Sequence, residues 1–279
     1  MTGFPGPDIT LDVNLANPGQ FFACCGVLEL ANRLWPGRGE TGWRSPEGWF
    51  ALDEGRATFA IATYSGDNDP LGAIVAKLVE GEPLVALAAD HEPYAGDRKP
   101  IVLGEPFNLR LDWWLDSYRG GDKSEMKVWA GQQTPLRNFE GLRNAWRDMI
   151  AANAETMAPA QILSRKWPMT GRFGFDPAAA PTSLDVGFST DEQGIPVLTS
   201  PATEMLAAIG LQRCRPVRDD RSRGRWFIYR AWADPLAINV APAAIADVGR
   251  AVATNTFPVT MRNSQYGNFG WAKRWESRQ

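Results

Sequence analysis

Apolar and polar side chains alternate in several segments of the first half of the chain. In ITLDVNL, residues 9–15, every second residue is apolar, the pattern of a half-buried strand. The segment 48–64 predicts a hairpin, because a Glu54-Gly55 turn precedes a second alternating run. The clearest alternation is FNLRLDWWLD, residues 107–116, for which we expect a further strand.

Two segments between these strands carry apolar residues at helical spacing. In NPGQFFACCGVLELANRLWP, Asn17 suits the N-cap, Pro18 the first helical position, and Gln20 the position from which a side chain reaches back to the cap. A second helix is expected from Asp69-Pro70 to residue 81. The Pro- and Gly-rich residues 87–105 are expected to form a loop.

The resulting order, β-α-β-β-α-β over residues 1–120, is that of the ferredoxin-like fold, which RNA-recognition domains share. Residues 121–279 are expected to be a mixed helix and strand half, either a second domain or part of the same globule. Its predicted helices cover 135–155 and 200–211, and its strand candidates cover 225–232, 235–241 and 257–262. The predicted fold class is α+β.

Composition places the chain among ordinary globular proteins. It has 279 residues, of which 44% are hydrophobic and 22% charged. Neither a membrane-spanning apolar run nor a signal-peptide pattern is present in the sequence, so we expect a soluble, cytoplasmic protein without membrane contact. The cysteines are three in number, and the adjacent Cys24 and Cys25 cannot bridge one another without strain. This agrees with a reducing compartment.

Positive charge is concentrated toward the end of the chain. The net charge is −3, yet residues 201–279 contain 12 Lys and Arg against 6 Asp and Glu. The densest run, RCRPVRDDRSRGR, contains Arg213, Arg215 and Arg218, and guanidinium groups make paired hydrogen bonds to phosphate oxygens. A solvated loop neutralised by Asp219 and Asp220 is the alternative interpretation.

Two segments interleave basic and aromatic residues, which is the composition of surfaces that bind single-stranded nucleic acid. One is SRKWPMTGRFGFDPAAA, residues 164–180, and the other is TMRNSQYGNFGWAKRW, residues 260–275. For the first, a Gly-rich turn with aromatic rings in the core is an equally good interpretation. The predicted nucleic-acid-binding residues are Arg165, Lys166, Trp167, Arg172, Phe173, Phe175, Arg213, Arg215, Arg218, Arg262 and Tyr266.

The sequence offers little for catalysis. His91 is the sole histidine, and Cys24 and Cys25 fall inside a capped apolar helix, where thiols usually stay protonated and buried. The helix start lacks the spacing of a phosphate-binding loop, and we expect a packed structural helix there. No catalytic residue, metal site, cofactor or small-molecule substrate is predicted, although carboxylate chemistry with a metal ion stays open.

Three segments together resemble a known family. NPGQFFACCGVLELANRLWP, WAGQQ at 129–133 and GRFGFDPAAAPTSLDVGFSTDEQG are similar to the Csb3 family, small effector-associated proteins of type I-G (formerly I-U) CRISPR systems, sometimes treated as variant large subunits. The resemblance covers nearly the whole chain. It implies a protein encoded beside the backbone, RNA-processing and helicase-nuclease components of a guide-RNA effector in antiviral defence, and it carries over no catalytic residues.

Three functions are therefore considered. The favoured one is a non-catalytic subunit or accessory protein of such an effector, contacting crRNA or target DNA and neighbouring subunits. Some of the 12 tryptophans would then supply subunit contacts, and the alternative is that they simply fill the core. A structural partner that never touches nucleic acid is the second function, and a metal-dependent carboxylate hydrolase is the third.

Overall fold

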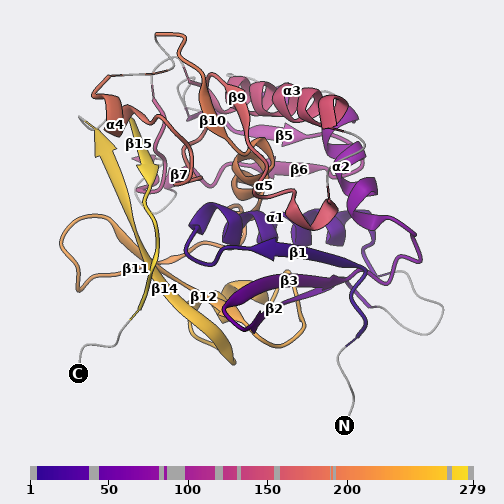
Figure 1. Ribbon diagram of the computed structural model, residues 1–279. Coiled ribbons are helices and arrows are strands. Elements are labelled where there is room, and N and C mark those ends of the chain that lie inside the picture. The colour runs from indigo at the N-terminus through magenta and orange to yellow at the C-terminus, as the bar shows by residue number, and fades with distance from the viewer. Residues whose placement is uncertain are drawn as a thin grey trace.

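Helices and strands are interleaved along the chain (Figure 1). The structure is a computed structural model, and it describes residues 5–37, 44–81, 85–86, 98–116, 122–130, 133–153, 158–188, 190, 193–262 and 266–275. Its helices are α1 (Pro18–Leu34), α2 (Pro70–Glu80), α3 (Pro135–Asn153), the short 3₁₀ helix η4 (Pro159–Gln161), α4 (Ser183–Val186), α5 (Pro201–Gly210) and α6 (Ala241–Ala246).

The strands form antiparallel sheets. A four-stranded sheet has the order β1 (Ile9–Val13), β3 (Arg56–Ala62), β2 (Glu47–Asp53) and β13 (Leu236–Ala237). A five-stranded sheet has the order β11 (Val217–Arg218), β12 (Trp226–Trp232), β14 (Ala251–Arg262) and β15 (Tyr266–Phe269), with β16 (Lys273–Arg274) also paired to β14. The smaller sheets join β4 (Val85–Ala86), β5 (Ile101–Leu103) and β6 (Leu109–Leu111), β7 (Leu115–Asp116) and β8 (Asp122–Lys123), and β9 (Trp167–Met169) and β10 (Val197–Thr199).

The N-terminal sheet confirms the first predicted strand and the predicted hairpin. Strand β1 lies antiparallel to β3, with Leu11 opposite Phe59 and both side chains fully buried. Strands β2 and β3 are joined at Glu54-Gly55, where both residues have positive φ, 44° and 82°. Such a two-residue turn matches the twist of the strands that it connects.

The α+β class is confirmed, with helices and antiparallel sheets in both halves of the chain. The predicted strand 107–116 is instead divided between β6 and β7, and β6 pairs with β5 rather than with the N-terminal sheet. The physical reason is that Trp113 and Trp114 are both fully buried, which a strand with one solvent face does not allow. The Gln212 side chain accepts hydrogen bonds from the N–H groups of Asp112 and Trp113 at this break. Strand β5 also lies within residues 87–105, which were predicted to be a loop.

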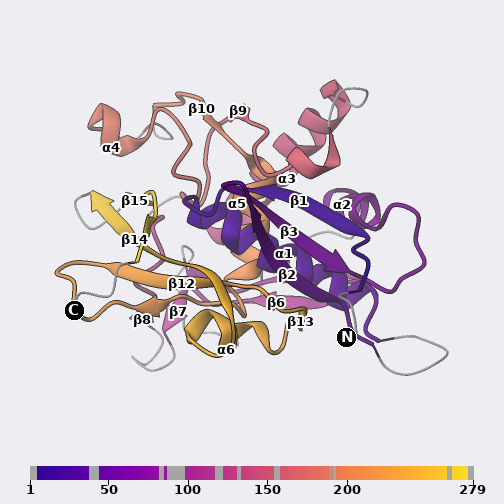
Figure 2. The same ribbon diagram turned by 60° about the horizontal axis from the view of Figure 1, so that its bottom comes forward.

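Helices α1 and α5 pack against each other in the middle of the molecule (Figures 1 and 2). Each begins with a proline after a polar N-cap, Asn17 for α1 and Ser200 for α5. A Cβ atom on Gly26 would clash with the Leu206 carbonyl, and one on Gly210 would clash with the Phe22 carbonyl. The two backbones are therefore in contact where the helices cross.

The paired phenylalanines of α1 connect it to two sheets. The Phe21 ring lies 5.2 Å from that of Phe50 in β2 and 4.3 Å from that of Tyr229 in β12. The Phe22 ring lies 6.1 Å from that of Phe257 in β14. Helix α1 is buried on all sides from residue 18 to residue 31, because sheets and α5 surround it.

The predicted packed helix with buried thiols is confirmed. Cys24, Cys25 and Cys214 are free and buried. Burial raises the pKa of Cys24 and of Cys25 well above the usual thiol value, and the neighbouring Cys214 adds to the rise at Cys25. These thiols are small core side chains.

The hydrophobic core is lined by residues from both halves of the chain, from Ile9 to Ala272. Much of the tryptophan content belongs to it, including Trp113, Trp114, Trp129, Trp146 and Trp232. Within the described ranges, no helix is both long enough and apolar enough to cross a membrane.

Candidate nucleic-acid interface

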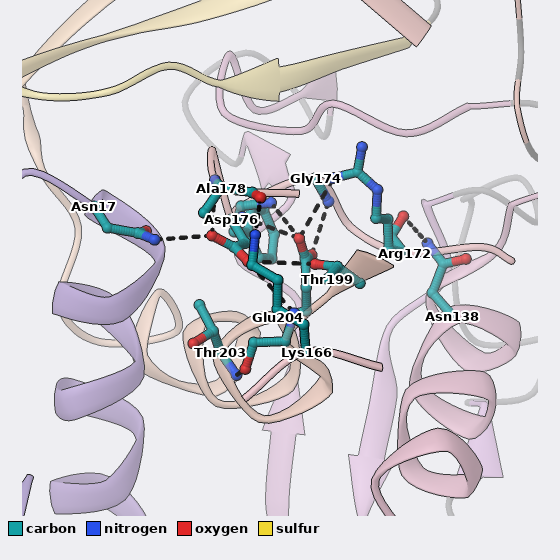
Figure 3. Close-up of polar contacts among 12 residues, drawn as sticks. Asn17, Asn138, Lys166, Arg172, Gly174, Asp176, Ala178, Thr199, Thr203 and Glu204 are labelled. Atoms are coloured by element: carbon teal, nitrogen blue, oxygen red, sulfur yellow. Dashed lines mark hydrogen bonds and ion pairs between the residues drawn. The ribbon is translucent and has the colours of Figure 1, made fainter. Parts of the chain in front are cut away.

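The buried carboxylate of Glu204 holds the loop 171–178, which has the sequence GRFGFDPA (Figure 3). Glu204, in the first turn of α5, is fully buried and accepts hydrogen bonds from the N–H groups of Gly174, Phe175 and Asp176 at 2.8, 3.0 and 3.0 Å. Gly174 has φ +92°, and a Cβ atom there would lie 2.8 Å from the Gly267 carbonyl. The glycine is thus required both by its dihedral angle and by the close approach of β15.

Asp176 joins the N-terminal ends of α1 and α5. Its carboxylate accepts from the Asn17 side-chain amide at 2.8 Å and from the Ser200 N–H at 3.4 Å. Both N-caps also bind their own helices, since Asn17 accepts from the Gln20 N–H and Ser200 from the Thr203 N–H. A negative charge between two helix N-termini is stabilised by the dipoles of both helices.

Arg172 lies in the interior of this junction. Its guanidinium group is 3.6 Å from the Glu204 carboxylate, and its side chain is only 10% exposed. Burial raises the pKa of Glu204, while the Arg172 charge and the N–H groups of Asp176 and Phe175 act in the opposite direction. Asn138 of α3 donates to the Arg172 carbonyl at 3.2 Å. In this fold, Arg172 is occupied by an internal ion pair.

Phe173 and Phe175 are likewise interior residues. They are 1% and 0% exposed, and their rings stack on each other with centroids 5.4 Å apart. Trp129 packs edge-on against Phe173 at 4.9 Å. The prediction that these two rings stack on bases is corrected here, because they offer no face to solvent. The alternative interpretation, a Gly-rich turn with aromatic rings in the core, describes them.

Two arginines of the basic run are also paired within the protein. Arg213 contacts the buried Glu29 at 2.7 Å, and this hydrogen bond raises the pKa of Arg213. Arg218 contacts Glu125 at 2.8 Å and donates to the Gly224 carbonyl at 2.6 Å. Both guanidinium groups therefore have protein partners where phosphate contacts were predicted.

The other predicted residues lie nearer the surface. Lys166 and Arg215 are exposed, and Arg165 and Trp167 are partly exposed. The Lys166 ammonium group donates to the Ala178 carbonyl, which holds the lysine against the loop 171–178. Two predicted residues, Arg262 and Tyr266, are paired in the backbone register at the end of the β14–β15 ladder, and their side chains lie outside the described part of the structure.

A surface that the site prediction omitted gathers cations from two distant segments. Arg221 and Arg223 of the β11–β12 loop are exposed, as are Lys273 and Arg274 of β16. The Arg221 guanidinium lies over the Trp275 ring, 5.6 Å from its centroid, which brings the loop to the C-terminal strand. We call these five residues the C-terminal basic surface. The charge run and the final aromatic cluster were visible in the sequence, but their proximity was not.

The two aspartates of the β11–β12 loop, Asp219 and Asp220, differ in their exposure to solvent. Asp219 is buried, where its carboxylate accepts from the Arg221 N–H at 3.1 Å and from the Ser222 hydroxyl at 2.6 Å. It therefore shapes the turn from inside. Asp220 is exposed beside the arginines.

A cleft of about 690 Å³ opens beside the junction of α1 and α5. Its walls come from the end of β1, the β2–β3 turn, the residues between η4 and β9, and the exposed Trp271. Arg56 and Lys166 contribute cations to the lining, and Asp12 contributes a carboxylate. Of these three residues, only Lys166 was among the predicted nucleic-acid-binding residues.

Comparisons with known proteins identify no relative. No family model matches the chain, and neither does any curated protein or solved structure. Within the described ranges, no group of three or more His, Cys, Asp and Glu residues is placed to hold a metal ion. His91 lies outside those ranges.

Proposed function

We propose that this chain is a non-catalytic, nucleic-acid-binding subunit of a guide-RNA effector complex of the type I-G CRISPR class. The observation that carries the nucleic-acid part is the C-terminal basic surface. Its four cations are exposed and come from two segments, and one of them, Arg221, lies over the Trp275 ring. Arg or Lys with aromatic faces is the combination that binds phosphates and bases.

The effector assignment is supported by the three sequence segments that resemble the Csb3 family. Two of these segments contact each other, because Asn17 at the start of α1 donates a hydrogen bond to Asp176 of the loop 171–178. The residues that carry the resemblance therefore lie together in the fold. A ferredoxin-like relationship of β1, α1, β2 and β3 belongs to the same proposal. The strand order β1-β3-β2 supports it, whereas β6 pairs with β5 in another sheet. Backbone subunits of such effectors are expected to share this arrangement.

A direct binding experiment tests the nucleic-acid part. Fluorescence anisotropy would measure the affinity of the purified chain for labelled single-stranded RNA, single-stranded DNA and duplex DNA. The variants Arg221→Ala/Arg223→Ala and Lys273→Ala/Arg274→Ala should each weaken binding about 5- to 30-fold, as expected for losing about 1–2 kcal/mol of charged contacts. Wild-type affinity in both variants would contradict the assignment of this surface.

A matched control removes two cations elsewhere. Lys77 of α2 and Arg143 of α3 line a small hollow, and Figure 1 places these helices on the side of the molecule away from β11 and the C-terminus. The Lys77→Ala/Arg143→Ala variant should bind nucleic acid as the wild type does. An equal loss in this control would show that only net charge matters.

The assignment to an effector complex is tested by co-purification with the expected partner subunits. The tagged chain would be co-expressed with its genomic neighbours and a guide array, and the purified material analysed for protein and RNA before and after a high-salt wash. Recovery of other subunits with a guide RNA of discrete length supports an effector subunit. Recovery of the tagged chain alone contradicts it.

A purely protein-binding role is the second candidate, and an exposed apolar strip favours it. Leu198 of β10 is 51% exposed, and it lies between the exposed Pro168 of β9 and the exposed Ala180. Under this role, association with the other subunits would survive high salt, and Leu198→Ser would weaken it. No nucleic acid would be recovered.

A further inference from the structure

The cleft beside the α1–α5 junction has the size of a site for a small molecule or a single nucleotide. Its volume of about 690 Å³ lies within the roughly 300–1,000 Å³ that such sites usually have. A duplex is too wide to enter a space of this size. The lining includes both charged and apolar side chains, drawn from segments that are far apart in sequence.

The lining residues beside the start of α1 are hydrogen-bonded within the protein. Asp176 is 2% exposed, and its carboxylate is bound by Asn17 and by the N–H groups of Ala178 and Ser200. The Gln20 side chain accepts from the Asn14 N–H at 2.8 Å and donates to the Leu163 carbonyl at 3.3 Å. These lining groups are already hydrogen-bonded, so a ligand would meet them as a fixed surface.

Two cations line the cleft from different segments. Arg56 is exposed at the start of β3, and Lys166 is exposed just before β9. Lys166 is positioned by its hydrogen bond to the Ala178 carbonyl, which leaves further ammonium protons for an anion. A phosphate group is the anion that suits an Arg and a Lys together.

An aromatic ring completes the lining. Trp271 is 47% exposed although it is large and apolar. The backbone of the residues before and after it is hydrogen-bonded to other segments. The Gly270 N–H donates to the Pro258 carbonyl at 2.8 Å, and the Ala272 N–H donates to the Ala16 carbonyl at 2.7 Å. An exposed indole on a fixed backbone is suited to stacking against a base.

We infer that the cleft holds one unpaired nucleotide of a bound RNA or DNA strand. The base stacks on Trp271, and the adjoining phosphate contacts Arg56 and Lys166. The Asp12 carboxylate, on the exposed face of β1, is available to accept a hydrogen bond from a base amino group.

This inference rests on the proposed function, because the C-terminal basic surface would deliver the strand. Lys273 and Arg274 begin two residues after Trp271. A strand that follows these cations therefore passes close to the cleft, where one base can leave its neighbours and enter.

The experiment uses the full chain and oligonucleotides that contain 2-aminopurine, whose fluorescence is quenched when it stacks. RNA and DNA versions distinguish the two kinds of strand. With the wild type, one position of the bound oligonucleotide should be quenched by the Trp271 ring, relative to the same position in the Trp271→Ala complex. Trp271→Ala should abolish this quenching and weaken binding roughly 5- to 100-fold, the range expected for one stacked base. Trp271→Phe should retain part of the quenching.

Controls separate the cleft from general effects. Phe188 is 42% exposed and does not line the cleft, so Phe188→Ala should leave both quenching and affinity unchanged. Arg56→Ala/Lys166→Ala should weaken binding, whereas Lys77→Ala/Arg143→Ala should not. Thermal melting followed by circular dichroism would confirm that each variant is folded.

The two proposals fail in different ways. If the strand binds and the C-terminal variants weaken it, but Trp271→Ala leaves quenching and affinity unchanged, the cleft assignment is overturned while the proposed function stands. If the wild type binds neither RNA nor DNA, both are overturned. Quenching with only one kind of strand supports the cleft and identifies its ligand.

Discussion

Glu29 shows at the scale of one residue how a charge is retained inside this protein. It lies in the buried helix α1 with 1% exposure, and Arg33 and Arg213 contact its two oxygens at 2.8 and 2.7 Å. Burial by itself would raise the pKa of Glu29, but the hydrogen bonds from Arg213 and Arg33 outweigh it, and the pKa is lowered. The ionised form therefore belongs to the folded state.

This lowered pKa predicts a pH-dependent contribution to stability. Because the pKa of Glu29 is lower in the folded protein than the ordinary 4.5, the stabilisation is present at neutral pH and is lost as the pH falls below 4.5 through the folded value. Glu29→Gln should lower the free energy of unfolding at pH 7 by about 1–3 kcal/mol. Urea unfolding at several pH values should show this difference shrinking in acid.

The matched control is another carboxylate that pairs with arginine. Glu125 contacts Arg218 at 2.8 Å, but both side chains are 33% exposed. Glu125→Gln should change stability by less than about 1 kcal/mol at pH 7, since solvent screens exposed ion pairs. An effect as large as that of Glu29→Gln would show that burial is not the deciding factor.

At the scale of elements, the contact between α1 and α5 organises the centre of the molecule. The helices touch through Gly26 and Gly210, and their N-caps share Asp176. The Leu163 carbonyl accepts from Gln20 of α1 and from Thr203 of α5, which ties the two first turns together again. The loop 171–178 is fixed at the end of this helix pair.

Adding one methyl group at the crossing should therefore separate the helices. Gly26→Ala places a Cβ atom against the Leu206 carbonyl, and we expect it to destabilise the fold by about 3 kcal/mol. Denaturant unfolding measures the loss.

Gly141 of α3 provides the opposite case for the same substitution. A Cβ atom there would have nothing within 4 Å. Gly141→Ala should leave stability unchanged or raise it by up to about 1 kcal/mol, because alanine favours the helix. Equal destabilisation at the two glycines would contradict the close-contact argument.

At the scale of the whole molecule, folding brings the basic loop after β11 to the C-terminal strand. The Arg221 guanidinium lies over the Trp275 ring, so the loop contacts the residue that follows β16. Lys273 and Arg274 lie on β16, which pairs with the middle of β14. The resulting surface has a local positive charge although the chain as a whole carries −3. Local charge of this kind attracts a polyanion at short range.

Binding through this surface should depend steeply on salt. Each phosphate contact to a single strand contributes about 0.7 to the slope of log affinity against log salt. Replacing the four cations by alanine should reduce that slope by about 2 to 3, measured by anisotropy between about 50 and 200 mM salt. An unchanged slope would mean that the strand binds elsewhere.

The sequence alone determined those parts of the local structure that depend only on residues close together in the chain. The alternation at residues 9–15, the Glu54-Gly55 turn, and the Asn-Pro and Asp-Pro helix starts were all predicted, and each is present. Period, turn dihedrals and capping depend on neighbouring residues, so they can be recognised without the fold. The burial of Cys24 and Cys25 followed from the same helical pattern.

Tertiary structure decided the pairing of strands and the fate of each charge and ring. Phe173 and Phe175 lie in a basic and aromatic segment with the composition of a base-stacking surface, but packing against Trp129, Phe139 and Phe269 makes them core residues. Arg213 likewise donates a hydrogen bond to Glu29, which lies 184 residues earlier in the sequence. Composition places a cation or an aromatic ring in a segment, but long-range contacts determine whether solvent, a carboxylate or another ring surrounds it.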